Sequence, residues 1–255
     1  MGKIIKGLTF NEQLDFAYVE FDDVFKTAKE IHNVSGEKAK YLGQILAVGG
    51  YMTSFLKNST DNMSINLRLK KGYNLNYFGD GNGNIKACIN DVEAGETSKI
   101  TVIKDLGLKN VYSGSCFFDG GILIGLKAYY SQSEQIFIDF KIEVNEQENK
   151  LRAIFYQCLP DADGDSIDYV LENVEKSVSD QLELFKKDGC YATEKQMIFK
   201  CLCSNEQIEK VLISVGKKEC ENIIKERGNV EVICHFCNKK YTYDKKMIEE
   251  LFKDV

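Results

Sequence analysis

The sequence predicts an α+β protein: an N-terminal domain of antiparallel strands and helices, an amphipathic helical segment, and a small cysteine-rich C-terminal domain. Three observations lead to this prediction. Apolar residues recur at spacings of three and four near residue 45, they alternate with polar residues in later segments, and four of the nine cysteines cluster near the C-terminus. These patterns are typical of a buried helix, of half-buried strands, and of a metal or redox site, respectively.

The period-two segments predict most of the sheet. Apolar residues alternate cleanly in the run Met63 to Leu69, and the sequence GDGNGN at 79–84 is a strong turn signal between two further strands. A polar turn at 145–149 joins two more alternating segments into a hairpin. The strands expected in this half of the chain are 13–21, 63–69, 73–78, 84–89, 99–103, 136–144 and 151–159.

Helices are expected between these strands, at 22–33, from residue 36 onward, and at 122–132. Ser35 has the character of an N-cap for the second of them. Three glycines at 43, 49 and 50 lower the intrinsic stability of this helix, so another backbone is expected to approach it closely there. After Pro160, a stripe of apolar residues between Ile167 and Phe185 predicts an amphipathic helix.

The C-terminal segment carries its own start and stop signals. Ser204 is expected to cap a helix that ends at Gly216, and a second helix is expected to end at Gly228. Two short strands, 230–234 and 239–243, and a final helix at 245–253 complete the predicted domain.

Four cysteines of this segment have the spacing of a metal site. Cys201 and Cys203 form a C-x-C pair, and after thirty intervening residues Cys234 and Cys237 form a C-x-x-C pair. Four thiolates suit tetrahedral zinc, and a site with four protein ligands leaves no position for a catalytic water. The sequence therefore predicts one structural Zn²⁺ per chain. Cys220 and His235 are possible substitute ligands, but neither belongs to a pair.

A metal site of this kind is also sensitive to oxidants. Domains of this size are marginal on their core alone, and zinc supplies about 10–16 kcal/mol of folding free energy in small zinc peptides. Thiolates are the form that oxidants attack, and each close pair can become a disulfide. Oxidation would then expel the metal and unfold the domain. Spacing alone leaves a second possibility open, a purely structural zinc ribbon that serves as an interaction module.

Other candidate sites are weaker. Asp161, Asp163, Asp165 and Glu172 have calcium-loop offsets, but Ser166 stands where the loop needs glycine, and an acidic helix start explains the run better. No Ser-His-Asp or Cys-His pairing indicates a hydrolase, and no thioredoxin-like context supports a thiol oxidoreductase. The remaining cysteines are expected to be small buried hydrophobes: Cys88, Cys116, Cys158, Cys190 and Cys220.

Charge and hydropathy exclude two classes of binding partner, nucleic acids and membranes. The net charge is −6, and residues 201–255 balance ten basic against ten acidic side chains, which argues against nucleic-acid binding. The N-terminus lacks the features of a signal peptide, and no apolar run is long enough to span a bilayer. We therefore expect a cytoplasmic protein that binds neither nucleic acid nor membrane.

The cysteine site and several upstream motifs resemble the heat-shock protein 33 family of redox-regulated chaperones. The resemblance covers nearly the whole chain and rests on these motifs: Cys201-Leu202-Cys203-Ser204, Cys234-His235-Phe236-Cys237-Asn238, Lys240-Tyr241, YLGQ at 41–44, VIKDLGL at 102–108, YSG at 112–114 and LP at 159–160.

The resemblance implies an ATP-independent holdase chaperone rather than an enzyme, inactive while reduced and zinc-bound. It implies an N-terminal chaperone core at 1–163, a helical linker at 164–198 and a redox-switch zinc domain at 199–255. Oxidants would form the disulfides Cys201–Cys203 and Cys234–Cys237 and release zinc. The linker would then unfold, unfolding client proteins would bind, and the active form would be a homodimer.

Overall fold

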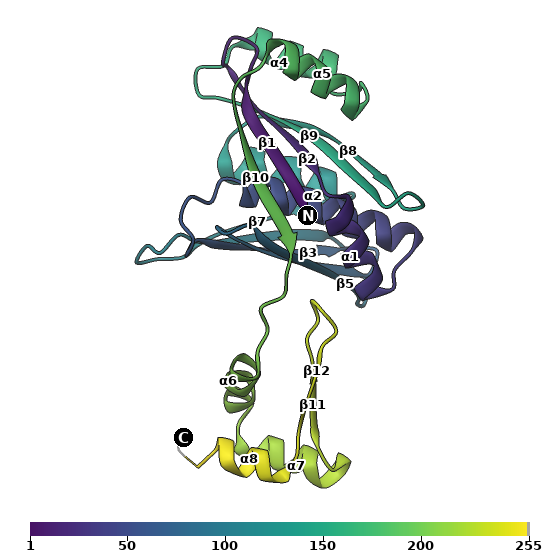
Figure 1. Ribbon diagram of the computed structural model, residues 1–255, viewed down its shortest axis with the longest axis vertical. Helices are drawn as coiled ribbons and strands as arrows, with labels where there is room; N and C mark the ends of the chain where they lie inside the picture. Colours follow the sequence, from purple (N-terminus) through teal and green to yellow (C-terminus); the bar gives the residue numbers. More distant parts are fainter. Residues whose placement is uncertain (254–255) are drawn as a thin grey trace. The chain divides into compact units, whose positions relative to one another are not determined.

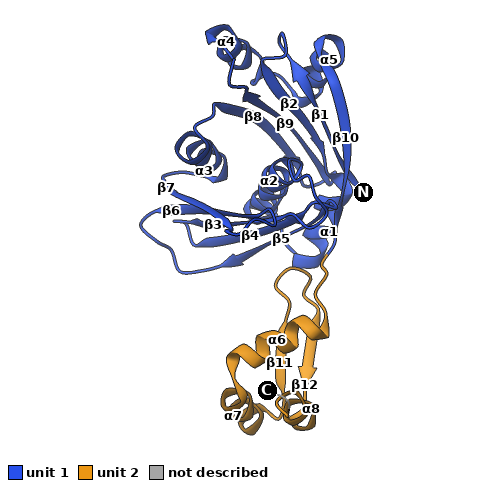
Figure 2. Cartoon of the chain, turned by 90° about the vertical axis from the view of Figure 1, so that its left-hand side faces the viewer, with its two compact units in different colours: residues 1–200 blue, residues 201–255 orange. Residues whose placement is uncertain are grey.

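The computed structural model describes residues 1–253 of the chain and divides it into two compact units. Unit 1 comprises residues 1–200 and unit 2 comprises residues 201–255 (Figure 2). Each unit is described by itself below. The mixture of one large sheet with helices in unit 1 confirms the predicted α+β class.

Unit 1 is built on a ten-stranded sheet with the order β7-β6-β3-β4-β5-β10-β1-β2-β9-β8. All its pairings are antiparallel except a short parallel contact between β10 and β5. The strands are β1 (Gly2–Thr9), β2 (Leu14–Glu20), β3 (Asn62–Leu69), β4 (Tyr73–Asp80), β5 (Asn84–Asp91), β6 (Ser98–Asp105), β7 (Tyr112–Phe118), β8 (Ile138–Asn145), β9 (Lys150–Cys158) and β10 (Cys190–Phe199).

The sheet bends around a central helix. Helix α2 (Gly36–Thr53) lies between the β1-β2-β9-β8 half and the β3-to-β7 half (Figure 1), and every residue from 41 to 53 is buried. The other helical elements of unit 1 are α1 (Asp22–His32), α3 (Ile122–Tyr129), the π-helix η1 (Tyr130–Glu134), α4 (Gly164–Asn173) and α5 (Val178–Asp188). Because α2 contacts both halves of the sheet, the main hydrophobic core is continuous around it.

Three glycines of α2 meet side chains rather than another backbone: aromatic rings at Gly49 and Gly50, and at Gly43 the methyl groups of Val144, 3.0 Å from an added Cβ. A Cβ added at Gly49 would lie 2.4 Å from the ring of Tyr77, and one at Gly50 would lie 2.3 Å from the ring of Phe21. The predicted close approach is therefore real, but the expectation that a backbone makes it is wrong. The rings arrive from β4 and from the start of α1, which the sequence pattern of α2 does not encode.

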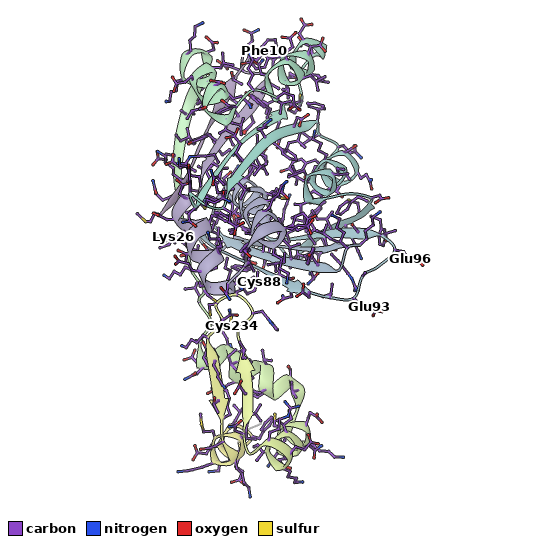
Figure 3. All side chains as sticks on the ribbon, turned by 90° about the vertical axis from the view of Figure 1, so that its right-hand side faces the viewer. Phe10, Lys26, Cys88, Glu93, Glu96 and Cys234 are labelled. Carbon is purple, nitrogen blue, oxygen red and sulfur yellow. The ribbon has the colours of Figure 1, made fainter. Side chains whose placement is uncertain are left out.

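The predicted single helix between residues 167 and 185 is two helices. Ser177 accepts a hydrogen bond from the backbone N–H of Asp180 and caps α5, so the chain breaks after α4. Both helices pack on the outer face of β2 and β9 in a second hydrophobic cluster, where Phe185 stacks on Phe16 with ring centroids 4.1 Å apart. Phe10, labelled in Figure 3, lies 4.7 Å from the ring of Tyr169 in the same cluster.

The helical linker predicted at 164–198 is helical only as far as Asp188. Residues Cys190–Phe199 form β10, which pairs antiparallel with β1 from Gly2↔Met197 to Leu8↔Cys190. Most residues of β10 are exposed or half-buried, and only Met197 is buried. Since the strand has no alternating apolar face, its conformation comes from pairing with a segment almost two hundred residues away. The compact units divide after Lys200.

Unit 2 has the five elements that the sequence predicts. They are α6 (Asn205–Val215), α7 (Lys217–Arg227), β11 (Val230–Ile233), β12 (Lys240–Tyr243) and α8 (Lys245–Leu251). The Ser204 side chain accepts from the backbone N–H of Gln207 and caps α6, as predicted. Gly216 and Gly228 end α6 and α7 with positive φ values of 95° and 84°. Seven buried hydrophobic residues form the core of this small unit.

Candidate metal centre

The two cysteine pairs occupy two short connections of unit 2. Cys201 and Cys203 lie just before the N-cap of α6, whereas Cys234 and Cys237 lie in the turn between β11 and β12. The hairpin register runs from Val230↔Tyr243 to Ile233↔Lys240, so its ladder ends next to the C-x-x-C. The start of α6 therefore positions the C-x-C pair, and the end of the β11–β12 hairpin positions the C-x-x-C pair.

The C-x-x-C forms a tight hydrogen-bonded turn. The backbone carbonyl of Cys234 accepts from the N–H of Cys237 at 3.3 Å and from that of Asn238 at 2.8 Å. The Cys234 N–H donates to the Lys239 carbonyl at 2.9 Å, which closes the turn. Asn238 has a left-handed φ of 58°, a conformation that asparagine tolerates better than most residues. This turn fixes the backbone positions from which both thiols project.

The four sulfur atoms converge within unit 2. All four Sγ atoms lie within 4.8 Å of one another. The shortest contacts join the two pairs: Cys201 Sγ is 3.6 Å from Cys234 Sγ, and Cys203 Sγ is 3.4 Å from Cys237 Sγ. Ligands about 2.3 Å from a tetrahedral zinc would lie about 3.8 Å from each other. The cluster therefore has the size that a four-sulfur metal site requires.

Tyr241 is a further residue of the site. Its phenol donates a hydrogen bond to Cys203 Sγ at 3.1 Å, and its ring is buried in the core of unit 2. The sequence places Tyr241 in a predicted strand and in a family motif, but neither pattern assigns it to the site. One sequence signal could have pointed to this role. Tyr241 and Tyr243 alternate in β12 and are therefore expected on its buried face, where a phenol needs a hydrogen-bond partner.

The thiols differ in acidity. Burial acts to raise the pKa of Cys203, but the hydrogen bond from Tyr241 and the contacts with the other three sulfurs outweigh it and lower the pKa to about 7. Burial raises the pKa of Cys237 to about 12. The hydrogen bond to Cys203 also raises the pKa of Tyr241 above its usual range. Cys203 thus ionises more readily than Cys237, and thiolate is the form that binds a metal.

Neither possible substitute ligand belongs to the cluster. The side chain of Cys220 is fully buried in the core, with its Sγ 3.9 Å from the Leu212 carbonyl, and His235 is exposed. Of the five isolated cysteines, three are buried as predicted, whereas Cys158 and Cys190 are only half-buried. Among residues 1–253, the four clustered cysteines are the group of His, Cys, Asp and Glu side chains positioned to share a metal ion.

The two alternative motifs have structural roles. Asp163 is the N-cap of α4, and its side chain accepts from the backbone N–H of Ser166, which confirms an acidic helix start instead of a calcium loop. The GDGNGN sequence is the β4–β5 turn. There the carboxylate of Asp80 accepts from the backbone N–H groups of Asn82 and Asn84, which confirms the predicted turn.

Comparison with known proteins identifies the family. A family model described as Hsp33 protein matches residues 2–244, which is nearly the whole chain. The chain belongs to the Hsp33 protein family. The protein is therefore an Hsp33-family chaperone, and its cluster of four cysteines is able to bind a metal ion. Chaperones are not a class of enzyme.

Individual relatives agree with this family membership. A protein named 33 kDa chaperonin from Clostridium perfringens (strain SM101 / Type A) is 27% identical over 290 residues, covering 99% of this chain and 92% of the relative. Another of that name, from Caldanaerobacter subterraneus subsp. tengcongensis, is 29% identical over 293 residues, covering 99% and 98%.

A solved structure shows the same fold. The crystal structure of the 33 kDa chaperonin (heat shock protein 33 homolog) from Thermotoga maritima superposes with a TM-score of 0.82 at 21% identity, covering 99% of this chain and 98% of that one. The Hsp33 fold thus accounts for both units. Within residues 1–253, no helix has both the length and the apolar character to cross a bilayer.

Proposed function

We propose that this Hsp33-family member is a redox-regulated, ATP-independent holdase that binds unfolding proteins under oxidative stress. In the proposal it is inactive while reduced and zinc-bound, and disulfide formation with zinc release activates it. The observation that carries the proposal is the convergence of four thiols within 4.8 Å inside a unit that has a small core. The same four atoms can bind a metal or be oxidised, but cannot do both.

Zinc is the metal proposed for the reduced protein. Cys201, Cys203, Cys234 and Cys237 would hold it, because four thiolates in a tetrahedral arrangement favour zinc and fill its coordination sphere. The ion would supply structural free energy and no catalytic position. Tyr241 would stabilise the thiolate of Cys203 through the hydrogen bond that it donates.

Oxidation would remove the ligands in pairs. In each step two thiolates and one peroxide molecule, with two protons, give one disulfide and two water molecules. The proposed disulfides are Cys201–Cys203 and Cys234–Cys237, as the family resemblance implies. Since two disulfides leave no thiolate for the metal, zinc would leave and unit 2 would lose the interaction that holds its small core together.

The α4–α5 segment, residues 164–188, is the proposed relay to client binding. Its apolar side chains now pack on β2 and β9, where Val170, Val178 and Phe185 are buried. Along the chain, β10 lies between this segment and Cys201, so unfolding of unit 2 would act on the strand that follows α5. Release of the segment would expose its apolar stripe and the sheet beneath it to unfolding proteins.

The first test couples metal content to chaperone activity. Peroxide or hypochlorite with mild heating is expected to release one zinc per chain and to suppress the aggregation of guanidinium-unfolded citrate synthase. Zinc is measured with a chelating dye, aggregation by light scattering, and the proposed dimer of the active form by sedimentation. A Cys190→Ser variant serves as the control and is expected to respond like the native protein, because Cys190 lies outside the cluster. Equal protection by the reduced and oxidised forms would contradict the switch.

The pairing of the disulfides has its own test. Trypsin cleaves between the two cysteine pairs, for instance after Lys210 and Lys225. Disulfides within each pair leave the resulting fragments separate under non-reducing conditions. Disulfides across the pairs, which the 3.4 Å and 3.6 Å sulfur contacts make the main competitor, keep these fragments joined. Mass spectrometry of the digest is expected to find separate fragments, and linked fragments would show that the proposed pairing is wrong.

One observation favours a second candidate, a structural zinc module without redox switching. The hydrogen-bonded C-x-x-C turn and the phenol of Tyr241 border the sulfur cluster, and they would restrict the approach of an oxidant. This candidate requires zinc to stay bound under the oxidising conditions above. Retention of zinc with unchanged hydrogen exchange in unit 2 would favour it.

A further inference from the structure

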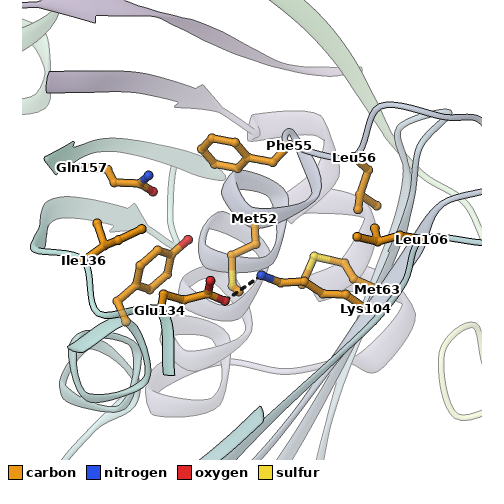
Figure 4. Close-up of a pocket in the computed structure, with 10 residues that line it drawn as sticks. Met52, Phe55, Leu56, Met63, Lys104, Leu106, Glu134, Ile136 and Gln157 are labelled. Carbon is orange, nitrogen blue, oxygen red and sulfur yellow. Dashed lines mark hydrogen bonds and ion pairs between the residues drawn. The ribbon is translucent and has the colours of Figure 1, made fainter. Parts of the chain in front are cut away.

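Unit 1 contains a pocket that the metal centre does not involve. It encloses about 250 Å³ and is lined by ten residues, most of them apolar: Met52, Phe55, Leu56, Met63, Lys104, Leu106, Tyr130, Glu134, Ile136 and Gln157. They come from the C-terminal end of α2, from β3, β6 and β9, and from η1 and the residues that follow it (Figure 4). No sequence pattern indicates this pocket, because its walls come from segments up to more than a hundred residues apart.

The π-helix η1 shapes one wall of the pocket. Tyr130 and Glu134, its first and last residues, both line the cavity. The element ends at Gln135 with a left-handed φ of 57°, and the N–H of Ile136 donates to the Tyr130 carbonyl at 3.3 Å. Short π-helices are rare and are frequently found at functional sites. Here the irregular turn carries a phenol and a carboxylate to the same cavity.

The two charged groups of the pocket are paired with each other, and its amide has a partner in the core. Lys104 Nζ lies 2.7 Å from Glu134 Oε1, which also accepts a hydrogen bond from the Tyr129 phenol at 2.7 Å. The side-chain amide oxygen of Gln157 (Oε1) accepts from the Tyr51 phenol at 2.9 Å. Lys104 and Glu134 are the two charged residues of the ten-residue lining, so its charges neutralise each other. A pocket of this kind gives no advantage to a charged ligand and favours an uncharged, apolar one.

The rim continues into an exposed apolar surface. Phe55 and Leu106 at the rim are 37% and 40% exposed, and Leu108 and Val111 in the following β6–β7 turn are 70% and 53% exposed. Two methionines line the inner wall, and methionine side chains adapt to apolar groups of different shape. The volume is below the roughly 300–1,000 Å³ of pockets for drug-sized ligands. One large apolar side chain on an extended chain suits this size and rim.

We propose that the pocket between α2, β6 and η1 binds single apolar side chains of unfolded polypeptides, with the flanking peptide lying across Leu106 and the β6–β7 turn. This inference rests on the proposed holdase function, for which it names a client-binding site in unit 1. The pocket would prefer clients with exposed phenylalanine or leucine side chains. Because methionine side chains adapt their shape, it would accept apolar side chains of different shapes.

Methionine NMR tests the proposal in the full-length protein. The chain has five methionines, of which Met52 and Met63 line the pocket. In protein labelled with ¹³C at the methionine methyl groups, a ten-residue glycine-serine peptide with one central phenylalanine is expected to shift these two signals. The signals of Met197 and Met247 are expected to stay in place, and the same peptide with serine at its centre is expected to shift none. Both reduced and oxidised protein are titrated.

Two variants give the contrast. Leu106→Asp places a carboxylate at the apolar rim and is expected to weaken peptide binding by about tenfold, equivalent to ~1.4 kcal/mol. Ile124→Asp is the matched control, because it also replaces an exposed apolar residue of unit 1 but lies outside the lining. Its position in the first turn of α3 favours an acidic side chain. It is expected to bind the peptide like the native protein, and unchanged Met197 and Met247 signals verify that each variant is folded.

Three outcomes overturn the proposal: no response of Met52 and Met63 in either redox form, equal binding by the Leu106→Asp variant, or shifts that depend on protein concentration without peptide. The last would assign the pocket to a second copy of the chain. The proposed function is judged separately by aggregation suppression. Aggregation suppression without a methionine response would contradict the proposed pocket and support the holdase function. A methionine response without redox-dependent suppression would support peptide binding in the pocket and contradict the redox-regulated holdase.

Discussion

Replacing Cys234 by serine is expected to remove the metal from unit 2 and to unfold this unit, while unit 1 stays folded. The serine leaves three thiolates but keeps the backbone carbonyl and N–H groups that organise the C-x-x-C turn. Zinc contributes about 10–16 kcal/mol in small zinc peptides, more than a core of this size supplies without it. Because the backbone groups of the turn remain, the loss would come from the missing ligand.

Zinc content and hydrogen exchange measure this outcome. The variant is expected to bind less than one zinc per chain and to lose exchange protection in α6, α7 and the β11–β12 hairpin, with protection of α2 retained. Cys158→Ser provides the same chemical change in unit 1, outside the cluster, and is expected to keep its zinc. A Cys234→Ser protein with full zinc content and native exchange would show that the ligand assignment is wrong.

Replacing Phe185 by alanine is expected to detach the α4–α5 segment and to give chaperone activity without an oxidant. Phe185 is 6% exposed and stacks on Phe16 at an interplanar angle of 9°. Loss of a buried phenylalanine typically costs about 3–5 kcal/mol, and Phe185 is the largest buried side chain of the two helices. If release of this segment is the step that exposes the client surface, the substitution bypasses the metal centre.

The measurement keeps the protein reduced throughout. With a reductant present, the Phe185→Ala variant is expected to lose exchange protection over residues 164–188 and to suppress aggregation of unfolded citrate synthase, with one zinc still bound. Leu171→Ala is the matched control, because Leu171 lies in α4 but is 54% exposed. Increased exchange without aggregation suppression would show that release of the α4–α5 segment is not enough to produce client binding.

The candidate metal centre was predictable because its signals are local. The two cysteines of each pair have only one or two residues between them. Ser204, Gly216 and Gly228 lie directly at the helix ends that they predict. A local signal also existed where the prediction failed. Ser177 followed by Asp180 is a capping pattern, and it would have divided the predicted helix between residues 167 and 185 at the position where the structure breaks it.

The remaining errors concern residues whose environment is set by distant partners. The strands β1 and β7 were not predicted, and the residues of β10 were assigned to a helical linker. β10 has one buried residue in ten, so no apolar alternation announces it, and its pairing with β1 joins opposite ends of unit 1. Tyr241 shows the same limit, because its hydrogen bond to Cys203 joins residues 38 apart in the sequence.

The sequence by itself determined the α+β class, the elements of unit 2 and the four clustered thiols, because capping, alternation and ligand spacing act over a few residues. Only the tertiary structure decided that Cys190–Phe199 is a strand, that α4 and α5 pack on β2 and β9, and that a neutral pocket opens beside η1. These features depend on contacts between segments far apart in the chain. Such contacts form only when the whole sheet closes around α2, and no window of sequence contains them.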